Sequence, residues 1–296
     1  MARPRTHTPL DVFLNGRLVG LLVRQPGGAV DFQYDPGWLA WKNAMPVSLS
    51  LPLREDRYSG APVVAVFDNL LPDTDEVRRR LAARVHAEGT DAYSLLAAIG
   101  RDCVGALQFL PQGTKPGPAG QVAGKTIGDK EIARILADLA TIPLGVDDAN
   151  EFRISIAGAQ EKTALLFWKR RWRIPRGSTA TTHILKPPIG KRGNLDLSES
   201  VENEHFCMRL AAALGLPVAQ TEIVNFGGPP TLVVERFDRL WARDGRLLRL
   251  PQEDCCQALS YPPTRKYESE GGPGMGEILQ LLDDHDDVHR VWAAVR

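Results

Sequence analysis

The residues best suited to chemistry lie in a loop of small and polar side chains at positions 155–162. The loop has Gly158 at its centre and separates two runs of β-forming residues. Glycine lets backbone N–H groups come close to a ligand, and a nearby lysine can neutralise an anion that they hold. Further along the chain, residues 183–186 read as a strand that ends in Lys186. A small-residue loop followed by a strand lysine is how kinase-type folds hold ATP phosphates, so we predict such a site here.

A glutamate on the next predicted helix is the expected partner of this lysine. Residues 198–214 favour a helix with Val201 and Met208 on its apolar face. Glu204 is three residues from the first and four from the second, which places it on the same face. A buried carboxylate needs a partner, and Lys186 lies on the strand just before the helix. Such a lysine–glutamate pair orders a kinase lysine against phosphates.

Each of these residues also has an ordinary structural interpretation. Gly158 could close a plain hairpin turn, and Lys186 could be a solvated residue at a strand edge. Glu204 could point to water, with Glu202 as the rival acid. Only the combination of loop, lysine and glutamate favours a nucleotide site.

The end of a later apolar strand offers a second contact for a nucleotide. Residues 232–234 are apolar and are followed by Glu235, Arg236 and Phe237. The backbone there could bind an adenine edge, as the strand that leaves the small lobe does in kinase-type folds, or it could be a surface strand end with charged residues. Residues 283–287 are rich in aspartate but lack the alternating ligand spacing of a calcium loop, so we interpret them as a charged turn. Walker P-loop, H-E-x-x-H and G-x-S-x-G motifs are absent from the sequence.

The composition is typical of a globular protein. The 296 residues are 43% hydrophobic, and 36 basic residues balance 36 acidic ones. This balance does not favour nucleic acid or an anionic membrane as a partner. No apolar run approaches the roughly 18 residues of a membrane span, and the N-terminus lacks a signal-peptide core, so we expect a cytoplasmic protein without a membrane partner. The four cysteines form no C-x-x-C pair, and we expect reduced thiols with Cys207 packed in a core.

The remaining pattern predicts a chain of mixed helices and strands. Asn15-Gly16 indicates a two-residue hairpin turn, and the run 111–120 is too rich in proline and glycine for a regular element. We predict strands at 10–14, 17–23, 30–34, 47–51, 221–226 and 231–237, a mainly stranded region at 152–186, and helices at 76–85, 91–99, from 129, at 198–214, 253–259, 275–282 and 286–295.

These motifs together strongly resemble the HipA family, the kinase partners in HipBA-type toxin–antitoxin pairs. The matching segments are residues 67–73, 153–162, 182–186, 195–204, 234–239 and 250–254. The resemblance implies an α+β fold with a kinase-like N-lobe and the start of a C-lobe, preceded by a small α/β N-terminal subdomain. It implies an N-terminal subdomain at 1–110, a linker or long loop at 111–128, an ATP-binding lobe at 129–250 and the start of a helical lobe at 251–296.

The resemblance also implies a function. Members of the family are serine/threonine protein kinases that use ATP and Mg²⁺, and their targets lie in translation, notably an aminoacyl-tRNA synthetase. Their activity arrests growth and favours persistence. The implied partner is a HipB-like helix-turn-helix antitoxin, through which operator DNA would be contacted mainly indirectly.

Particular residues receive roles from the resemblance. Ser155 would be the autophosphorylated serine, and a phosphate there would add a charge of roughly −2 and eject the loop from its ATP-binding position. Lys186 would contact the ATP phosphates, with Glu204 as the supporting acid. The phosphate loop would comprise Ala157, Gly158, Ala159, Gln160, Glu161 and Lys162, and the adenine hinge Glu235, Arg236 and Phe237.

The sequence departs from the family pattern near its end. The family places its catalytic aspartate in a D-x-x-x-x-N segment, but no asparagine follows Asn225 here. We therefore expect that the catalytic aspartate and the metal ligands would lie beyond Arg296. The alternative function is a catalytically inactive, antitoxin-binding fragment that acts as a corepressor or decoy.

Overall fold

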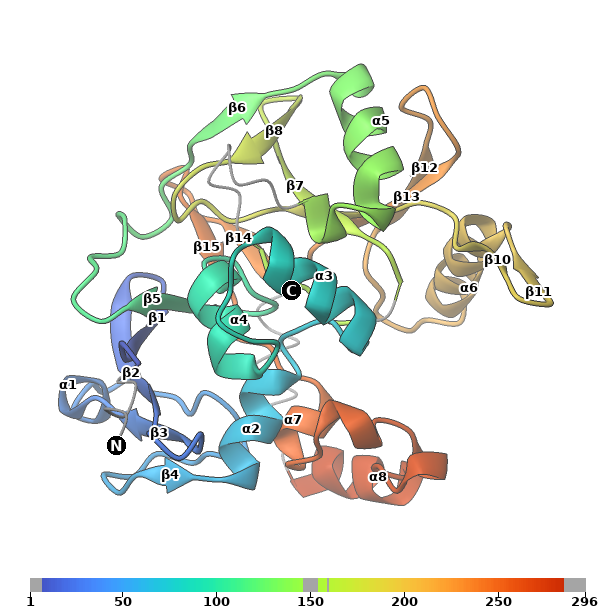
Figure 1. Cartoon of the computed structure of the whole chain (residues 1–296). Helices are drawn as coiled ribbons and strands as arrows, with labels where there is room; N and C mark the ends of the chain where they lie inside the picture. The colour runs from blue at the N-terminus through green and yellow to red at the C-terminus, as the bar shows by residue number, and fades with distance from the viewer. Residues whose placement is uncertain (1–6, 146–153, 159, 285–296) are drawn as a thin grey trace.

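Two antiparallel sheets organise the molecule in the computed structural model, which describes residues 7–145, 154–158 and 160–284. Within these residues the first sheet has the strand order β4-β3-β2-β1-β5, and the second has the order β12-β13-β9-β7-β8-β6 (Figure 1). A contiguous apolar core runs from Leu10 and Phe32 in the first sheet to Leu165 and Val233 in the second. The mixture of helices and sheets agrees with the predicted α+β class.

The first sheet contains the predicted hairpin. Its strands are β1 (Leu10–Leu14), β2 (Arg17–Arg24), β3 (Val30–Tyr34), β4 (Tyr58–Ser59) and β5 (Leu107–Pro111). Asn15 and Gly16 have φ angles of 46° and 81°, which suit the tight turn that their residue types predict.

Four helices accompany this sheet: α1 (Pro36–Leu39), α2 (Ala61–Asp68), α3 (Asp75–Arg84) and α4 (Ala92–Ile99). The Asp91 carboxylate caps α4 by accepting from the Ser94 N–H. Phe67 of α2 packs edge-to-face against Phe32 and Phe109, with ring centroids 5.5 Å apart in both pairs. The helices predicted at 76–85 and 91–99 are confirmed.

The strand predicted at residues 47–51 is wrong. The segment is a turn in which the Leu51 N–H donates to the Ser48 carbonyl over 3.0 Å. The Ser48 and Ser50 hydroxyls both donate to the Gln257 carbonyl, over 3.2 and 2.7 Å. The alternation of serine and leucine therefore reflects a contact with a distant segment rather than a strand with one face exposed to solvent.

The second sheet carries the segments expected to bind a nucleotide. Its strands are β6 (Gly124–Thr126), β7 (Thr163–Trp168), β8 (Arg171–Pro175), β9 (His183–Lys186), β12 (Thr221–Val224) and β13 (Thr231–Glu235). Helix α5 (Asp129–Ala137) buries Ile132 and Leu136, as its spacing predicts. Helix α6 (Ser200–Ala213) packs against β12 and β13. Residues 154–156, which precede the loop and were expected to be stranded, form no strand. The Ser155 N–H donates to the Asp102 carbonyl in an irregular segment, and no neighbouring strand among the described residues pairs with them.

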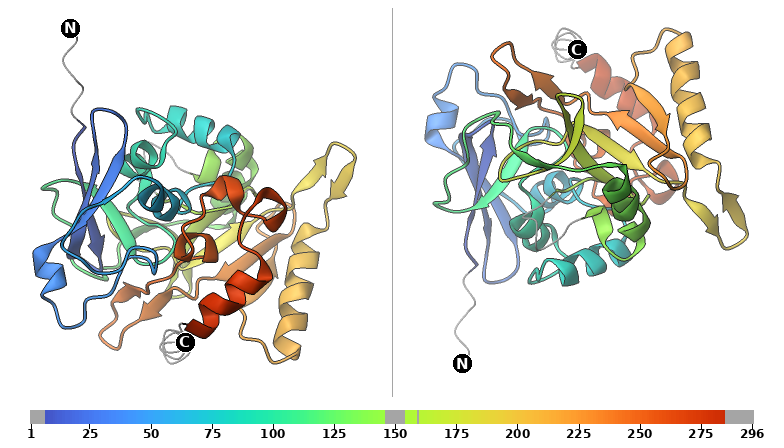
Figure 2. Two further views of the ribbon diagram at one scale, coloured as in Figure 1. Left: turned by 90° about the horizontal axis from the view of Figure 1, so that it is seen from below. Right: turned by 90° about the horizontal axis from the view of Figure 1, so that it is seen from above.

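The remaining elements lie around these two sheets. They are β10 (Gly190–Arg192), β11 (Leu195–Leu197), β14 (Arg239–Trp241), β15 (Leu247–Arg249), α7 (Cys255–Ala258), α8 (Met275–Asp284) and short 3-10 turns at Asp138–Ala140, Pro143–Gly145, Pro263–Arg265 and Glu268–Glu270. Helix α7 packs on α2, so the chain returns to the N-terminal part (Figure 1). Figure 2 shows α6 and the β10–β11 hairpin projecting from one side. The helix predicted at 286–295 lies outside the described residues.

Two further sequence expectations concern cysteines and membranes. All four cysteines are free, but Cys207 is exposed, so its predicted place in a core is wrong. It lies on α6, which buries only Val201. In the described part of the chain, no helix combines the length and apolarity needed to cross a bilayer.

Candidate functional site

A lysine–glutamate ion pair lies at the centre of the candidate site. Lys186 is the last residue of β9, which lies between β7 and β13 in the second sheet. Its Nζ is 2.6 Å from Oε1 of Glu204 on α6, and both side chains are partly buried, with 20% and 35% exposed. The rival acid Glu202 is exposed. The structure therefore forms the pair that the helix spacing and the strand lysine predict.

The glycine loop lies close to a second lysine. Gly158 has a φ of 105°, and a Cβ there would lie 2.8 Å from Nζ of Lys162. Lys162 Nζ donates to the Ala157 carbonyl over 3.0 Å, and the Gly158 N–H donates to Oδ1 of Asp73 over 3.2 Å. The positive φ therefore favours glycine at this position, and a larger residue would also displace the end of the Lys162 side chain. Ala159 lies outside the described residues.

The local charge around this loop favours an anion. Lys162 is only 5% exposed. Burial, and next the charge of Lys186, lowers the pKa of Lys162 to about 8, although Asp73 and Glu161 act in the opposite direction. The Asp73 carboxylate is itself shared with Lys266, whose Nζ lies 2.9 Å from Oδ2. A phosphate beside Lys162 would relieve the cost of its buried charge.

Ser155 is held inside the protein in this arrangement of the loop. Its side chain is fully buried, and its N–H donates to the Asp102 carbonyl over 2.9 Å. Its hydroxyl donates to the Leu70 carbonyl. A phosphate on Ser155 would not fit without displacement of the loop, because the hydroxyl is enclosed. The autophosphorylation of Ser155 stays a prediction.

The N-terminal part of the chain holds the loop at further points. Arg80 on α3 forms an ion pair with Glu161, with Nη2 and Oε1 2.9 Å apart. On the other side, the Gln160 amide donates to the Pro187 carbonyl over 3.1 Å. Together with the Asp73 and Leu70 contacts, these bonds fix the loop between α3 and the strand that carries the lysine. Sequence reasoning missed Asp73 and Arg80 as loop contacts, because nothing local in their segments indicates it.

The proposed adenine hinge is partly used by the protein itself. The Glu235 N–H donates to the Gln220 carbonyl and the Arg236 N–H to the Thr182 carbonyl, each over 2.9 Å. The Arg236 side chain is 5% exposed and points into the interior, whereas Phe237 is 50% exposed. The structure therefore gives the Arg236 side chain a role in packing, and an adenine contact in this segment stays a prediction.

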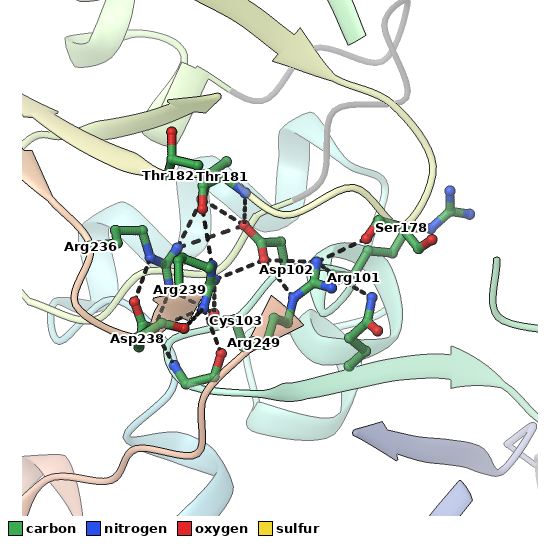
Figure 3. A network of polar contacts seen from close by, with 12 residues as sticks. Arg101, Asp102, Cys103, Ser178, Thr181, Thr182, Arg236, Asp238, Arg239 and Arg249 are labelled. Atoms are coloured by element: carbon green, nitrogen blue, oxygen red, sulfur yellow. Dashed lines mark hydrogen bonds and ion pairs between the residues drawn. The ribbon is translucent and has the colours of Figure 1, made fainter. Parts of the chain in front are cut away.

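Arg236 belongs to a buried network that the sequence did not reveal (Figure 3). Arg239 Nη2 and Arg249 Nε each lie 2.9 Å from Oδ1 of Asp102, and Arg236 Nη2 lies 2.7 Å from Oδ2 of Asp238. Burial raises the pKa of Asp102, but the three arginines outweigh it and hold that pKa well below its usual range. Asp102 follows α4 and the arginines follow β13, so the network joins the two sheets. The charged residues after β13 can be recognised in the sequence, but their partner Asp102 lies more than 100 residues earlier, so the network could not be predicted.

A hollow of about 540 Å³ lies beside the ion pair, between Gln160, the β10–β11 hairpin and the first turns of α6. Its lining includes Glu199, Asn203, Glu204 and Cys207. Within the described ranges, no three His, Cys, Asp or Glu side chains come together in a way that could hold a metal ion. Mg²⁺ at a nucleotide site is usually bound by one or two carboxylates together with substrate phosphates and water, so its binding here stays a prediction.

A central-strand lysine paired with a helix glutamate, next to a glycine loop, is the arrangement found in the nucleotide sites of kinase-like folds. The family model of the HipA N-terminal domain matches residues 10–110, and that of the HipA-like C-terminal domain matches residues 154–295. The chain belongs to the HipA family.

Individual relatives agree with this assignment. The chain is 40% identical to the protein Y4mE of Sinorhizobium fredii over 276 residues. The aligned region covers 92% of this chain and 64% of the relative. It is 33% identical to the serine/threonine-protein kinase toxin HipA of Shewanella oneidensis, over 79% of this chain and 51% of the relative. The chain therefore spans between about half and two thirds of the length of these relatives.

A solved structure gives the same result in three dimensions. HipA of Shewanella oneidensis, in a complex with HipB and its operator DNA, matches with a TM-score of 0.70 and 30% sequence identity. The match covers 90% of this chain and 60% of that one. The kinase-like α+β fold predicted from the sequence is confirmed.

Proposed function

We propose that this chain holds the phosphates of ATP between the 155–162 loop, Lys162 and Lys186. The observation that carries the proposal is the 2.6 Å ion pair between Lys186 and Glu204, since it fixes a lysine at the end of a central strand beside a glycine loop. Lys162 adds a second cation, and the two nearby carboxylates, of Asp73 and Glu161, already form ion pairs with Lys266 and Arg80. Two lysines and the backbone N–H groups of the loop supply the donors that phosphate oxygens need.

Each residue has a distinct part in this proposal. Glu204 orients Lys186 toward the phosphates, and Lys162 contributes charge from within the loop. The Gly158 N–H now donates to Asp73, so a phosphate oxygen would take the place of that carboxylate. ATP would supply the transferable phosphoryl group. Because the Glu235 and Arg236 N–H groups are bonded within the protein, the adenine would contact Phe237 and the carbonyl groups of residues 235–237.

The wider role follows from the relatives. We propose that the whole protein acts as a serine/threonine kinase toxin with a HipB-like antitoxin as partner, and that operator DNA is contacted mainly through the antitoxin. The similarity to a structure that contains HipB and operator DNA supports this partner. A substrate in translation, such as an aminoacyl-tRNA synthetase, is the finer proposal. Phosphate incorporation into a candidate synthetase, absent with Lys186→Ala, would support it.

Titration calorimetry with ATP tests the nucleotide site. Lys186→Ala should weaken ATP binding at least about tenfold, because a charge-assisted hydrogen bond to phosphate contributes roughly 1.5–3 kcal/mol. Lys125→Ala is the matched control, since Lys125 forms a 2.9 Å ion pair with Glu131 on the surface of the same sheet region. Equal loss of affinity in both variants, or none in either, would refute the role of Lys186.

A second function is favoured by the intact N-terminal sheet. Its five strands pair continuously, and its helices share the main core, so this part can present a complete surface to an antitoxin. In that case the chain binds the antitoxin without phosphoryl transfer and acts as a corepressor or decoy. The intact mass before and after incubation with MgATP separates the two functions. Added phosphate, mapped to Ser155, contradicts the inactive form.

A further inference from the structure

A second hollow, remote from the Lys186–Glu204 pair, is lined by positively charged side chains where the two sheets meet. It has a volume of about 330 Å³ and lies between β5, the irregular segment after it and the loop that follows β8. This volume is at the lower end of small-molecule sites, roughly 300–1,000 Å³. Six of its lining residues carry the argument: Arg101, Thr114, Lys115, Gln121, Arg176 and Ser178.

The cations in this hollow have no acidic partner. Arg101, Lys115 and Arg176 take part in none of the ion pairs found among the described residues, and no side-chain hydrogen bond of theirs is found there either. No aspartate or glutamate belongs to the lining. The chain as a whole has equal numbers of basic and acidic residues, so three unpaired cations around one hollow are a local excess of positive charge.

A buried arginine behind two lining residues adds to this potential. Arg249 Nη2 lies 3.0 Å from the Ser178 carbonyl and 3.5 Å from the Arg101 carbonyl (Figure 3). Arg249 belongs to the buried network of three arginines and two aspartates, which leaves one positive charge without a carboxylate. Buried charge is weakly screened, so its field reaches the hollow.

We propose that this hollow binds a small anion that carries one or two phosphate groups. Arg101 and Arg176 have the planar donors that match phosphate oxygens, and Lys115 adds a mobile ammonium group. The Thr114 and Ser178 hydroxyls and the Gln121 amide can complete the hydrogen bonds. The bound anion joins the segment after β5 to the loop after β8, and so fastens the two sheets together. This site is independent of the proposed nucleotide site.

Calorimetry with inorganic pyrophosphate at constant ionic strength tests the proposal. The variant R101Q/K115Q/R176Q should bind at least about tenfold more weakly, since three charge-assisted donors are removed. The control variant K130Q/R171Q/R209Q removes the same residue types from exposed positions outside the hollow and should retain the affinity. Pyrophosphate binding should also persist in Lys186→Ala, which separates this site from the nucleotide site.

Three results of these binding measurements would overturn the proposal. The proposal is overturned if the hollow variant binds pyrophosphate as well as the unmodified chain, or if the control variant loses as much affinity. It is also overturned if Lys186→Ala abolishes the binding. The single variant Lys115→Gln, on an exposed and irregular segment, covers the case in which the triple variant does not fold. It should weaken pyrophosphate binding by about threefold or more, since one donor is lost, and an unchanged affinity counts against the site.

Discussion

At the scale of single residues, Lys162 has the most unusual environment in the candidate site. It is almost fully buried, and burial lowers its pKa to about 8. A bound phosphate favours the charged lysine and raises this pKa again. ATP binding should therefore take up a proton near pH 8, and the affinity should fall as the pH rises above about 8, where the free protein loses that proton.

Calorimetry of ATP binding at pH 8 in two buffers with different ionisation enthalpies checks this proton uptake. The apparent binding enthalpy should differ between the buffers for the unmodified chain and should not differ for Lys162→Met. Identical heats in both buffers for the unmodified chain would show that Lys162 is already fully protonated or lies away from the phosphates.

At the scale of elements, helix α3 acts as a support for the phosphate loop through the Arg80–Glu161 ion pair. Arg80→Ala should loosen the loop and weaken ATP binding by roughly two- to tenfold, the effect of a partly buried charge pair. Faster hydrogen exchange in residues 156–162 is the direct measure. Arg79→Ala is the control, because Arg79 is exposed on the same helix and donates to the Asp75 carbonyl of its own turn. Equal exchange in both variants would contradict the role of α3.

The elements also show what the sequence can and cannot predict. Helix α6 and strand β9 were predictable because spacing within a few residues determines them, and the pair between Lys186 and Glu204 joins two elements that lie close together in the sequence. The turn at residues 47–51 and the irregular segment 154–156 were not, because their partners, Gln257 and Leu70, lie far away in sequence. The same reason hid Asp102 as the partner of Arg236.

At the scale of the whole molecule, the buried charge network holds the two sheets together. Asp102 contacts three arginines from the second half of the chain. Asp102→Asn should destabilise the protein by about 3–5 kcal/mol, because it leaves buried arginine charge without a partner. Urea unfolding measures this change. The control Asp244→Asn breaks an exposed pair with Arg246 and should leave the urea midpoint unchanged. Similar midpoints for both variants would show that the network does not join the sheets.

The central claim is that Lys162, Lys186 and the glycine loop hold the phosphates of ATP. A crystal structure of this chain with a non-hydrolysable ATP analogue tests it most directly. We predict phosphate oxygens within hydrogen-bond distance of Lys186 Nζ and Lys162 Nζ, and a Gly158 N–H that has left Asp73 for the nucleotide. A nucleotide bound elsewhere, or one whose phosphates touch neither lysine, would contradict the account.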